Sequence, residues 1–105
     1  MILTLHRLEL AEQLGPGEIR PFQIEGRSLI LVRCEKGHAL TDSICPHAGT
    51  SLAGGGVVGN RLRCPNHGYM FDLQTGNCAM GRREGWGPLK VYPLQTIDGY
   101  LFVDL

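Results

Sequence analysis

Residues 45–76 read CPHAGTSLAGGGVVGNRLRCPNHGYMFDLQTG, and this stretch contains two short motifs that each combine a cysteine with a histidine. The first motif is Cys45-Pro46-His47, and the second is Cys64-Pro65-Asn66-His67, with 16 residues between them. Thiolates and imidazoles are the ligands of zinc and of iron–sulfur centres, and two of each complete either a tetrahedral zinc site or a mixed-ligand cluster. The stretch therefore predicts a metal site built from two loops.

The spacing within each motif separates these two kinds of site. Structural zinc usually takes like pairs, Cys-x(2-4)-Cys with His-x(3-5)-His, whereas here each loop supplies one cysteine and one histidine. Cys-x-His followed by Cys-x-x-His resembles the Rieske family of 2Fe-2S proteins. The resemblance extends to Leu52, to the glycines before the hairpin, to Phe71-Asp72 and to Thr75-Gly76.

The chain beyond residue 76 also resembles this family. Gly87-Pro88-Leu89 is similar to the proline-containing third loop that covers the cluster, and the segments 91–94 and 102–103 are similar to the closing strands. The resemblance implies an all-β fold of antiparallel strands, a Rieske-type β-sandwich with a small inserted cluster-binding subdomain. It also implies one domain over residues 1–105, with the cluster-binding subdomain at about 44–88.

The resemblance implies one Rieske-type 2Fe-2S cluster and a role for each ligand. Cys45 and Cys64 would hold the buried iron through sulfur, and His47 and His67 would hold the outer iron through nitrogen. Two ferric ions, two sulfides and two thiolates sum to zero charge, so one added electron leaves the centre singly negative. An all-cysteine cluster starts doubly negative, which explains why Rieske centres are easier to reduce than plant-type ferredoxins.

Two further comparisons with the family concern the reduction potential. Respiratory and photosynthetic Rieske proteins carry a disulfide between the two loops, and the corresponding residues here are Thr50 and Asn66. They also use a serine and a tyrosine to donate hydrogen bonds to the cluster sulfurs, at positions that correspond to Tyr69 and Phe71. Because Phe71 has no hydroxyl and such donors stabilise the reduced state, we expect a low potential, about -150 mV.

The resemblance to small Rieske ferredoxins implies a function. Such proteins carry single electrons from a flavin-dependent reductase to a terminal oxygenase, typically an aromatic-ring-hydroxylating dioxygenase. A Rieske oxygenase also needs a mononuclear iron held by two histidines and a carboxylate, and the remaining His6 and His38 are not arranged to supply it. We therefore expect an electron-transfer protein with no catalytic residue of its own.

Two alternative functions stay open at this point. One is a Rieske-type small subunit of assimilatory nitrite reductase, which purification with a sirohaem partner would reveal. The other is a zinc-stabilised interaction module, which metal analysis and the colour of the protein would reveal.

The size and charge of the chain limit its partners. It has 105 residues, of which 43% are hydrophobic, and a formal net charge of +0, which fits one compact domain and argues against nucleic-acid binding through bulk positive charge. The first residues contain neither a signal-peptide core nor an apolar stretch of about 20 residues, so we expect a cytoplasmic monomer that does not bind a membrane. The excess of basic residues between positions 45 and 90 fits an ordinary solvated face. An alternative hypothesis is that Arg82, Arg83 and Trp86 help to dock acidic partners.

The secondary structure that we expect consists of short strands separated by turns. Tight turns are expected at 35–37, 59–60 and 98–99, a tight loop at the glycines 54–56, and at most one helical turn at 9–14. The remaining cysteines, Cys34 and Cys78, are expected to be small buried residues without a ligand role. The strands predicted from short runs of β-branched and large apolar residues cover 3–8, 18–24, 28–33, 38–43, 61–64, 69–73, 90–95 and 100–104.

Overall fold

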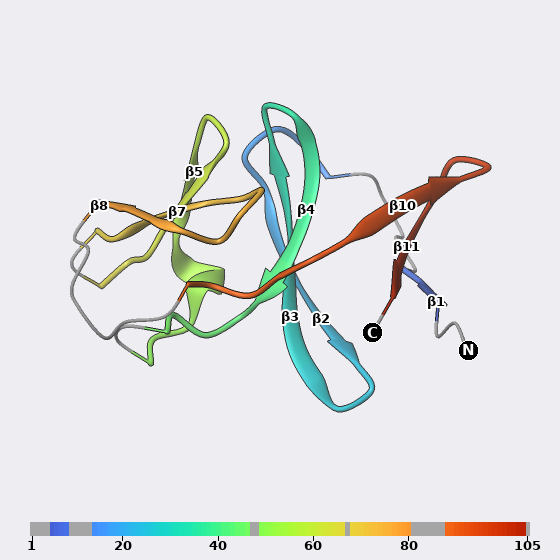
Figure 1. The fold of residues 1–105 in the computed structure, drawn as a ribbon, viewed down its shortest axis with the longest axis horizontal. Helices are drawn as coiled ribbons and strands as arrows, with labels where there is room; N and C mark the ends of the chain where they lie inside the picture. Colours follow the sequence, from blue (N-terminus) through green and yellow to red (C-terminus); the bar gives the residue numbers. More distant parts are fainter. Residues whose placement is uncertain (1–4, 9–13, 47–48, 67, 81–87, 105) are drawn as a thin grey trace.

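The computed structural model describes residues 5–8, 14–46, 49–66, 68–80 and 88–104. These residues form three antiparallel sheets (Figure 1), so the predicted all-β fold is confirmed. The strands are β1 Leu5–Arg7, β2 Ile19–Ile24, β3 Arg27–Cys34, β4 Gly37–Asp42, β5 Gly56–Val58, β6 Arg61–Arg63, β7 Met70–Asp72, β8 Cys78–Met80, β9 Val91–Tyr92, β10 Leu94–Ile97 and β11 Tyr100–Asp104, with a short 3-10 helix, η1, at Leu52–Gly54.

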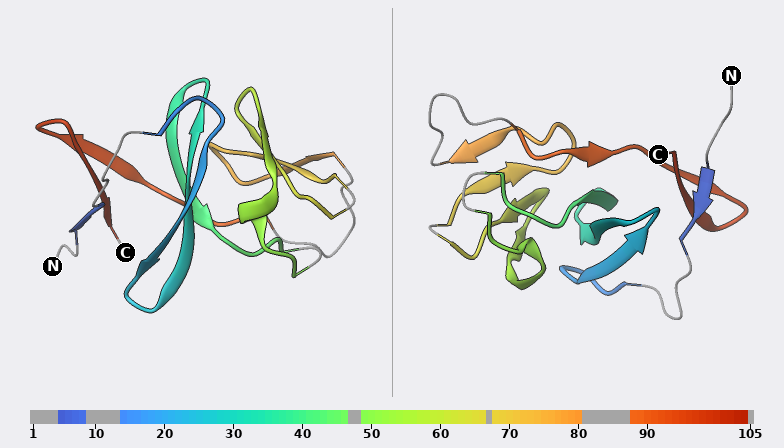
Figure 2. Two further views of the ribbon diagram at one scale, coloured as in Figure 1. Left: turned by 180° about the vertical axis from the view of Figure 1, so that it is seen from behind. Right: turned by 90° about the horizontal axis from the view of Figure 1, so that it is seen from below.

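The three sheets lie side by side along the molecule. The central sheet has the order β2-β3-β4-β9, the distal sheet the order β5-β6-β7-β8, and the terminal sheet the order β1-β11-β10. Views from behind and from below place the distal and terminal sheets on opposite sides of the central sheet (Figure 2). The central sheet therefore contacts a neighbour on each side.

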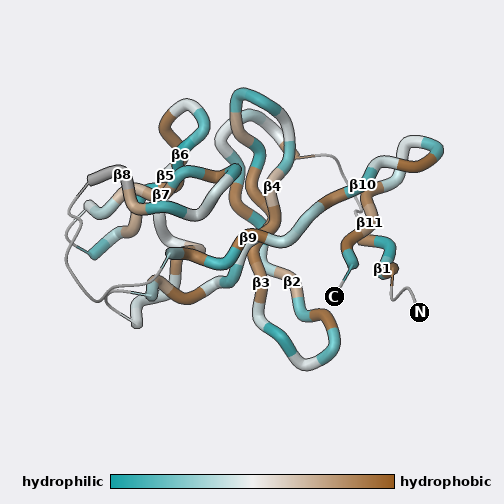
Figure 3. The backbone as a smooth tube through the Cα atoms, in the orientation of Figure 1, coloured by the Kyte–Doolittle hydropathy of each residue, from teal (hydrophilic) through white to brown (hydrophobic). Residues whose placement is uncertain are grey.

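The central strand β3 explains this arrangement. Successive side chains of a strand point to opposite faces, and both faces of β3 are buried. Leu29 and Leu31 belong to one apolar cluster with Val103 of the terminal sheet, whereas Ile30 and Val32 belong to a second cluster that contains Cys45. Hydrophobic segments accordingly mark the middle of this sheet in Figure 3. The unbroken apolar run of β3 is typical of a strand buried on both faces.

The expected strands are mostly present, with two omissions and one division. The strands β5 and β8 were not predicted, and the expected tight loop at 54–56 is wrong in part because Gly56 begins β5. The expected strand 90–95 is divided at Pro93 into β9 and β10, which belong to different sheets. Proline has no backbone N–H to donate to a ladder, so the chain changes sheets there.

The predicted turns are confirmed, and two of them hold the distal sheet against the central sheet. The backbone N–H of Glu35 donates to the Gly59 carbonyl at 3.1 Å, and the backbone N–H of Lys36 donates to Oδ1 of Asn60 at 2.8 Å. The Asn60 carbonyl in turn accepts from the Leu73 N–H at 3.0 Å. Asn60 thus links the β3–β4 turn to the chain that follows β7.

Helical structure is minor in the described ranges. The helical turn considered at 9–14 falls, apart from Leu14, outside the described residues. No helix in the described part of the chain is long and apolar enough to cross a membrane.

Candidate metal centre

The two cysteines of the Cys/His motifs lie at the bases of two closed loops. Cys45 begins the first loop, where its N–H donates to the Thr50 carbonyl at 2.8 Å and its carbonyl accepts from the Gly49 N–H at 2.9 Å. Cys64 follows β6, and its N–H donates to the Tyr69 carbonyl at 2.7 Å. Both side chains are buried, at 1% and 0% exposure. Short backbone hydrogen bonds therefore fix both sulfur atoms in the protein interior.

The two thiols are neighbours, close enough to share a hydrogen bond. Burial raises the pKa of the Cys64 thiol, and the adjacent Cys45 thiol raises it further, while a hydrogen bond from the Asn66 backbone N–H has the opposite effect. Neither cysteine forms a disulfide. Two free neighbouring cysteines, with a backbone donor beside one of them, fit the sulfur side of a mixed-ligand cluster.

The expected nitrogen ligands, His47 and His67, lie outside the described residues. Each belongs by sequence to the same loop as one of the buried cysteines. Within the described ranges, no group of three potential histidine, cysteine or carboxylate ligands forms a second metal site.

A direct side-chain hydrogen bond joins the two loops. Nδ2 of Asn66 donates to Oγ1 of Thr50 at 3.2 Å. These are the positions that the sequence comparison assigned to the inter-loop disulfide of other Rieske proteins, and the structure brings them together. In this chain a hydrogen bond takes the place of that disulfide. It is the weaker link, since a single hydrogen bond contributes only about 1 kcal/mol.

The segment after β7 forms a turn that is held by the Asp72 side chain. Oδ1 of Asp72 accepts from the backbone N–H groups of Gln74 at 2.7 Å and Thr75 at 3.1 Å, and these bonds lower the pKa of its carboxyl group. The turn leads to Gly76, whose carbonyl accepts from the Leu89 N–H at 2.9 Å. Asp72 and Gly76 belong to the stretch that resembles the Rieske family, but the resemblance assigns them no role; an aspartate before a turn was the available signal.

The third loop reaches the same core. Pro88 and Leu89 are its described residues, and Leu89 is 2% exposed in the apolar cluster that contains Cys45 and Cys64. Phe71, at 0% exposure, belongs to this cluster as well. The expected docking residues 82, 83 and 86 lie outside the described residues.

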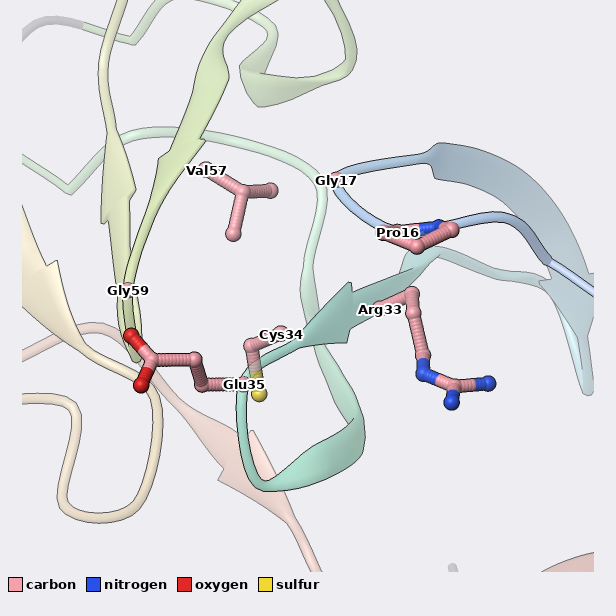
Figure 4. Close-up of a pocket in the computed structure, with 7 residues that line it drawn as sticks. All are labelled: Pro16, Gly17, Arg33, Cys34, Glu35, Val57 and Gly59. Carbon is pink, nitrogen blue, oxygen red and sulfur yellow. The ribbon is translucent and has the colours of Figure 1, made fainter.

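The other two cysteines do not fully match the expectation. Cys34 and Cys78 are only partly buried, because each lies at the margin of the apolar cluster rather than inside it. Cys34 lines a pocket of about 200 Å³ with Val57 and Pro16 (Figure 4). His38 lies beside Arg33 on the paired strand β3, and burial lowers its pKa.

The family model of the Rieske [2Fe-2S] domain matches residues 5–93. This chain belongs to the Rieske [2Fe-2S] domain family, and its cofactor is a Rieske-type 2Fe-2S cluster.

The chain resembles both long proteins that contain a similar region and short proteins of about its own length. Cholesterol 7-desaturase nvd 1 of Ciona intestinalis is 41% identical over 102 residues, which cover 92% of this chain and 22% of that protein. The ferredoxin component of the naphthalene 1,2-dioxygenase system of Pseudomonas aeruginosa is 27% identical, with 89% of this chain and 88% of that protein covered. The chain thus spans about a fifth of the desaturase and most of the ferredoxin component.

Solved structures share the fold. A chain in the complex of reduced oxygenase and oxidized ferredoxin in carbazole 1,9a-dioxygenase is 27% identical, with a TM-score of 0.79 and coverage of 93% of this chain and 99% of that one. The ferredoxin of carbazole 1,9a-dioxygenase from Nocardioides aromaticivorans IC177 has a TM-score of 0.80 at 24% identity, and the match covers 95% and 96% of the two chains.

Proposed function

We propose that Cys45, His47, Cys64 and His67 ligate the 2Fe-2S cluster. The burial and adjacency of the two thiols support the cysteine pair. The position of each histidine in a loop closed by backbone hydrogen bonds supports the imidazole pair. We further propose a cluster-binding subdomain at about 44–88, which would contain the whole distal sheet.

On this ligand set, the chain is an electron carrier and not an enzyme in its own right. The cluster supplies one-electron chemistry when it is bound. The protein contributes backbone hydrogen bonds at the bases of the two loops, buried cysteine side chains and a surrounding apolar cluster that includes Leu62 and Phe71. Loops that change little on reduction favour fast electron transfer, because less of the surroundings must rearrange.

The partners that best fit are a flavin-dependent reductase as the electron donor and a terminal oxygenase as the electron acceptor. The carrier itself would be a cytoplasmic monomer. Resemblance over most of a dioxygenase ferredoxin component supports this assignment, as does the structural match to a chain of an oxygenase–ferredoxin complex. The acceptor would be an aromatic-ring-hydroxylating dioxygenase.

A second candidate function is the electron-entry domain of a Rieske oxygenase. The 41% identity to a cholesterol 7-desaturase favours it. Iron analysis of the complete native protein separates the two: a carrier holds two irons per chain, whereas an oxygenase that contains this domain holds a third, mononuclear iron outside it.

The assignment is tested by electron paramagnetic resonance of the dithionite-reduced protein, purified without oxygen, together with iron and zinc analysis. We expect a rhombic signal of low average g value and two irons per chain. A silent spectrum with one zinc per chain would instead make the protein a zinc-stabilised module.

The reduction potential is expected near the low end of the Rieske range, about -150 mV. The physical reason is that Phe71 is fully buried and offers no hydroxyl to a cluster sulfur. A spectroscopic redox titration measures the value. A potential above about +100 mV, within the same family range, would contradict both the tuning argument and the choice of partners.

A further inference from the structure

Arg63 occupies a special position between the distal sheet and the second ligand loop. It is the last residue of β6 and directly precedes Cys64. The alternation along this strand buries Leu62 and exposes Arg61 and Arg63 on the other face. Strand geometry alone would direct the two arginines to the same solvent-exposed surface.

The Arg63 side chain nevertheless packs against the ligand loop. Its Nε and Nη2 atoms each lie 3.3 Å from the position that a Cβ on Gly68 would occupy. Gly68 follows His67 directly, so the guanidinium group lies on the backbone of the loop that carries two of the proposed ligands. The missing side chain of Gly68 makes this close approach possible.

The charge of Arg63 has no counterion in the described structure. Among the described residues, no carboxylate lies within salt-bridge distance of its guanidinium group. Arg61 differs, because Asp72 is its direct partner across β6 and β7 and interacts with it electrostatically. The two arginines thus share a strand and a face, but only Arg63 presents an uncompensated charge to the ligand loop.

We propose that Arg63 is a positioning and tuning residue that raises the reduction potential of the cluster by stabilising its reduced, more negative state. This inference rests on the ligand set proposed above. Reduction adds one electron, supplied by dithionite in the redox titration that measures the potential, and no protein bond forms or breaks. A fixed positive charge beside the ligand loop lowers the free energy of the reduced state more than that of the oxidised state.

The test compares the reduction potentials of the wild-type protein, Arg63→Gln, Arg63→Lys and the matched control Arg61→Gln, each fully loaded with cluster. We expect R63Q to decrease the equilibrium constant for reduction by roughly three- to tenfold, where tenfold corresponds to about 59 mV for one electron. R63K should restore most of the loss, and R61Q should change the constant by less than a third as much. The difference between wild type and R63Q should shrink at high ionic strength, because salt screens exposed charges.

Three outcomes would overturn the proposal. Equal shifts in R63Q and R61Q would indicate general surface charge, and an unchanged potential in R63Q would remove the effect altogether. Failure of R63Q and of a second neutral variant, Arg63→Met, to bind any cluster would make Arg63 a structural residue. The electron paramagnetic resonance spectrum of the wild-type protein tests the ligand set independently, so failure of the proposed function is recognised separately.

Discussion

Replacement of Cys64 by serine is expected to abolish the 2Fe-2S centre. Serine has nearly the same shape but a hydroxyl that binds iron much less well than a thiolate, so the packing changes little while a ligand is lost. Since binding of a metal centre contributes directly to the free energy of folding, C64S should also have a lower melting temperature than the loaded wild type. Iron content, visible absorption and thermal unfolding measure the three effects.

Cys34→Ser is the matched control for this experiment. Cys34 is a free cysteine of the same chain, at the margin of the same apolar cluster and outside the ligand loops. C34S should keep two irons per chain and the wild-type spectrum. Normal cluster spectra in C64S, or an equal loss of iron in C34S, would contradict the ligand assignment.

Gly76→Ala is expected to destabilise the protein by roughly 3 to 4 kcal/mol. Gly76 is buried with a φ of 81°, a conformation that disfavours any residue with a Cβ. In addition, a Cβ on Gly76 would overlap the backbone carbonyl of Leu89, which cannot move without displacing the third loop. Chemical denaturation of the loaded protein measures the loss.

Gly99→Ala separates the cost of the positive φ from the cost of the overlap with the Leu89 carbonyl. Gly99 has the same φ of 81°, but a Cβ there would meet nothing within 4 Å. G99A should therefore cost only the conformational part, roughly 1 to 2 kcal/mol. If both variants lost the same stability, the contact between Gly76 and Leu89 would have no energetic importance.

The site illustrates how far a sequence can be interpreted. The spacing of the Cys/His motifs predicted the family, because ligand spacing within a short loop is a local property. The correspondence of Thr50 and Asn66 with the disulfide positions of other Rieske proteins also located two residues that are in contact. The hydrogen bond between them was not predictable, since it depends on how two loops 16 residues apart in the sequence approach in space.

The secondary structure likewise contains elements that could be predicted from local sequence and elements that could not. Turns such as Asp98-Gly99 were predicted because both residues tolerate a positive φ, and the structure has φ values of 52° and 81° there. The strand β5 was missed although it contains two valines, because the glycines at 54–56 favoured a loop there. The strand β8 was missed because it is short and includes alanine, which is depleted in strands.

The sequence by itself determined the all-β class, the main strands and turns, and the two Cys/His motifs that we propose as the cluster ligands. All of these depend on residues that are near one another in the chain. Only the tertiary structure decided that the two faces of β3 serve different cores, that Gly76 must accommodate the Leu89 carbonyl, and that Arg63 rather than Arg61 rests on the ligand loop. These features arise from contacts between distant segments, whose geometry is set by the packing of whole sheets and not by the local pattern of residues.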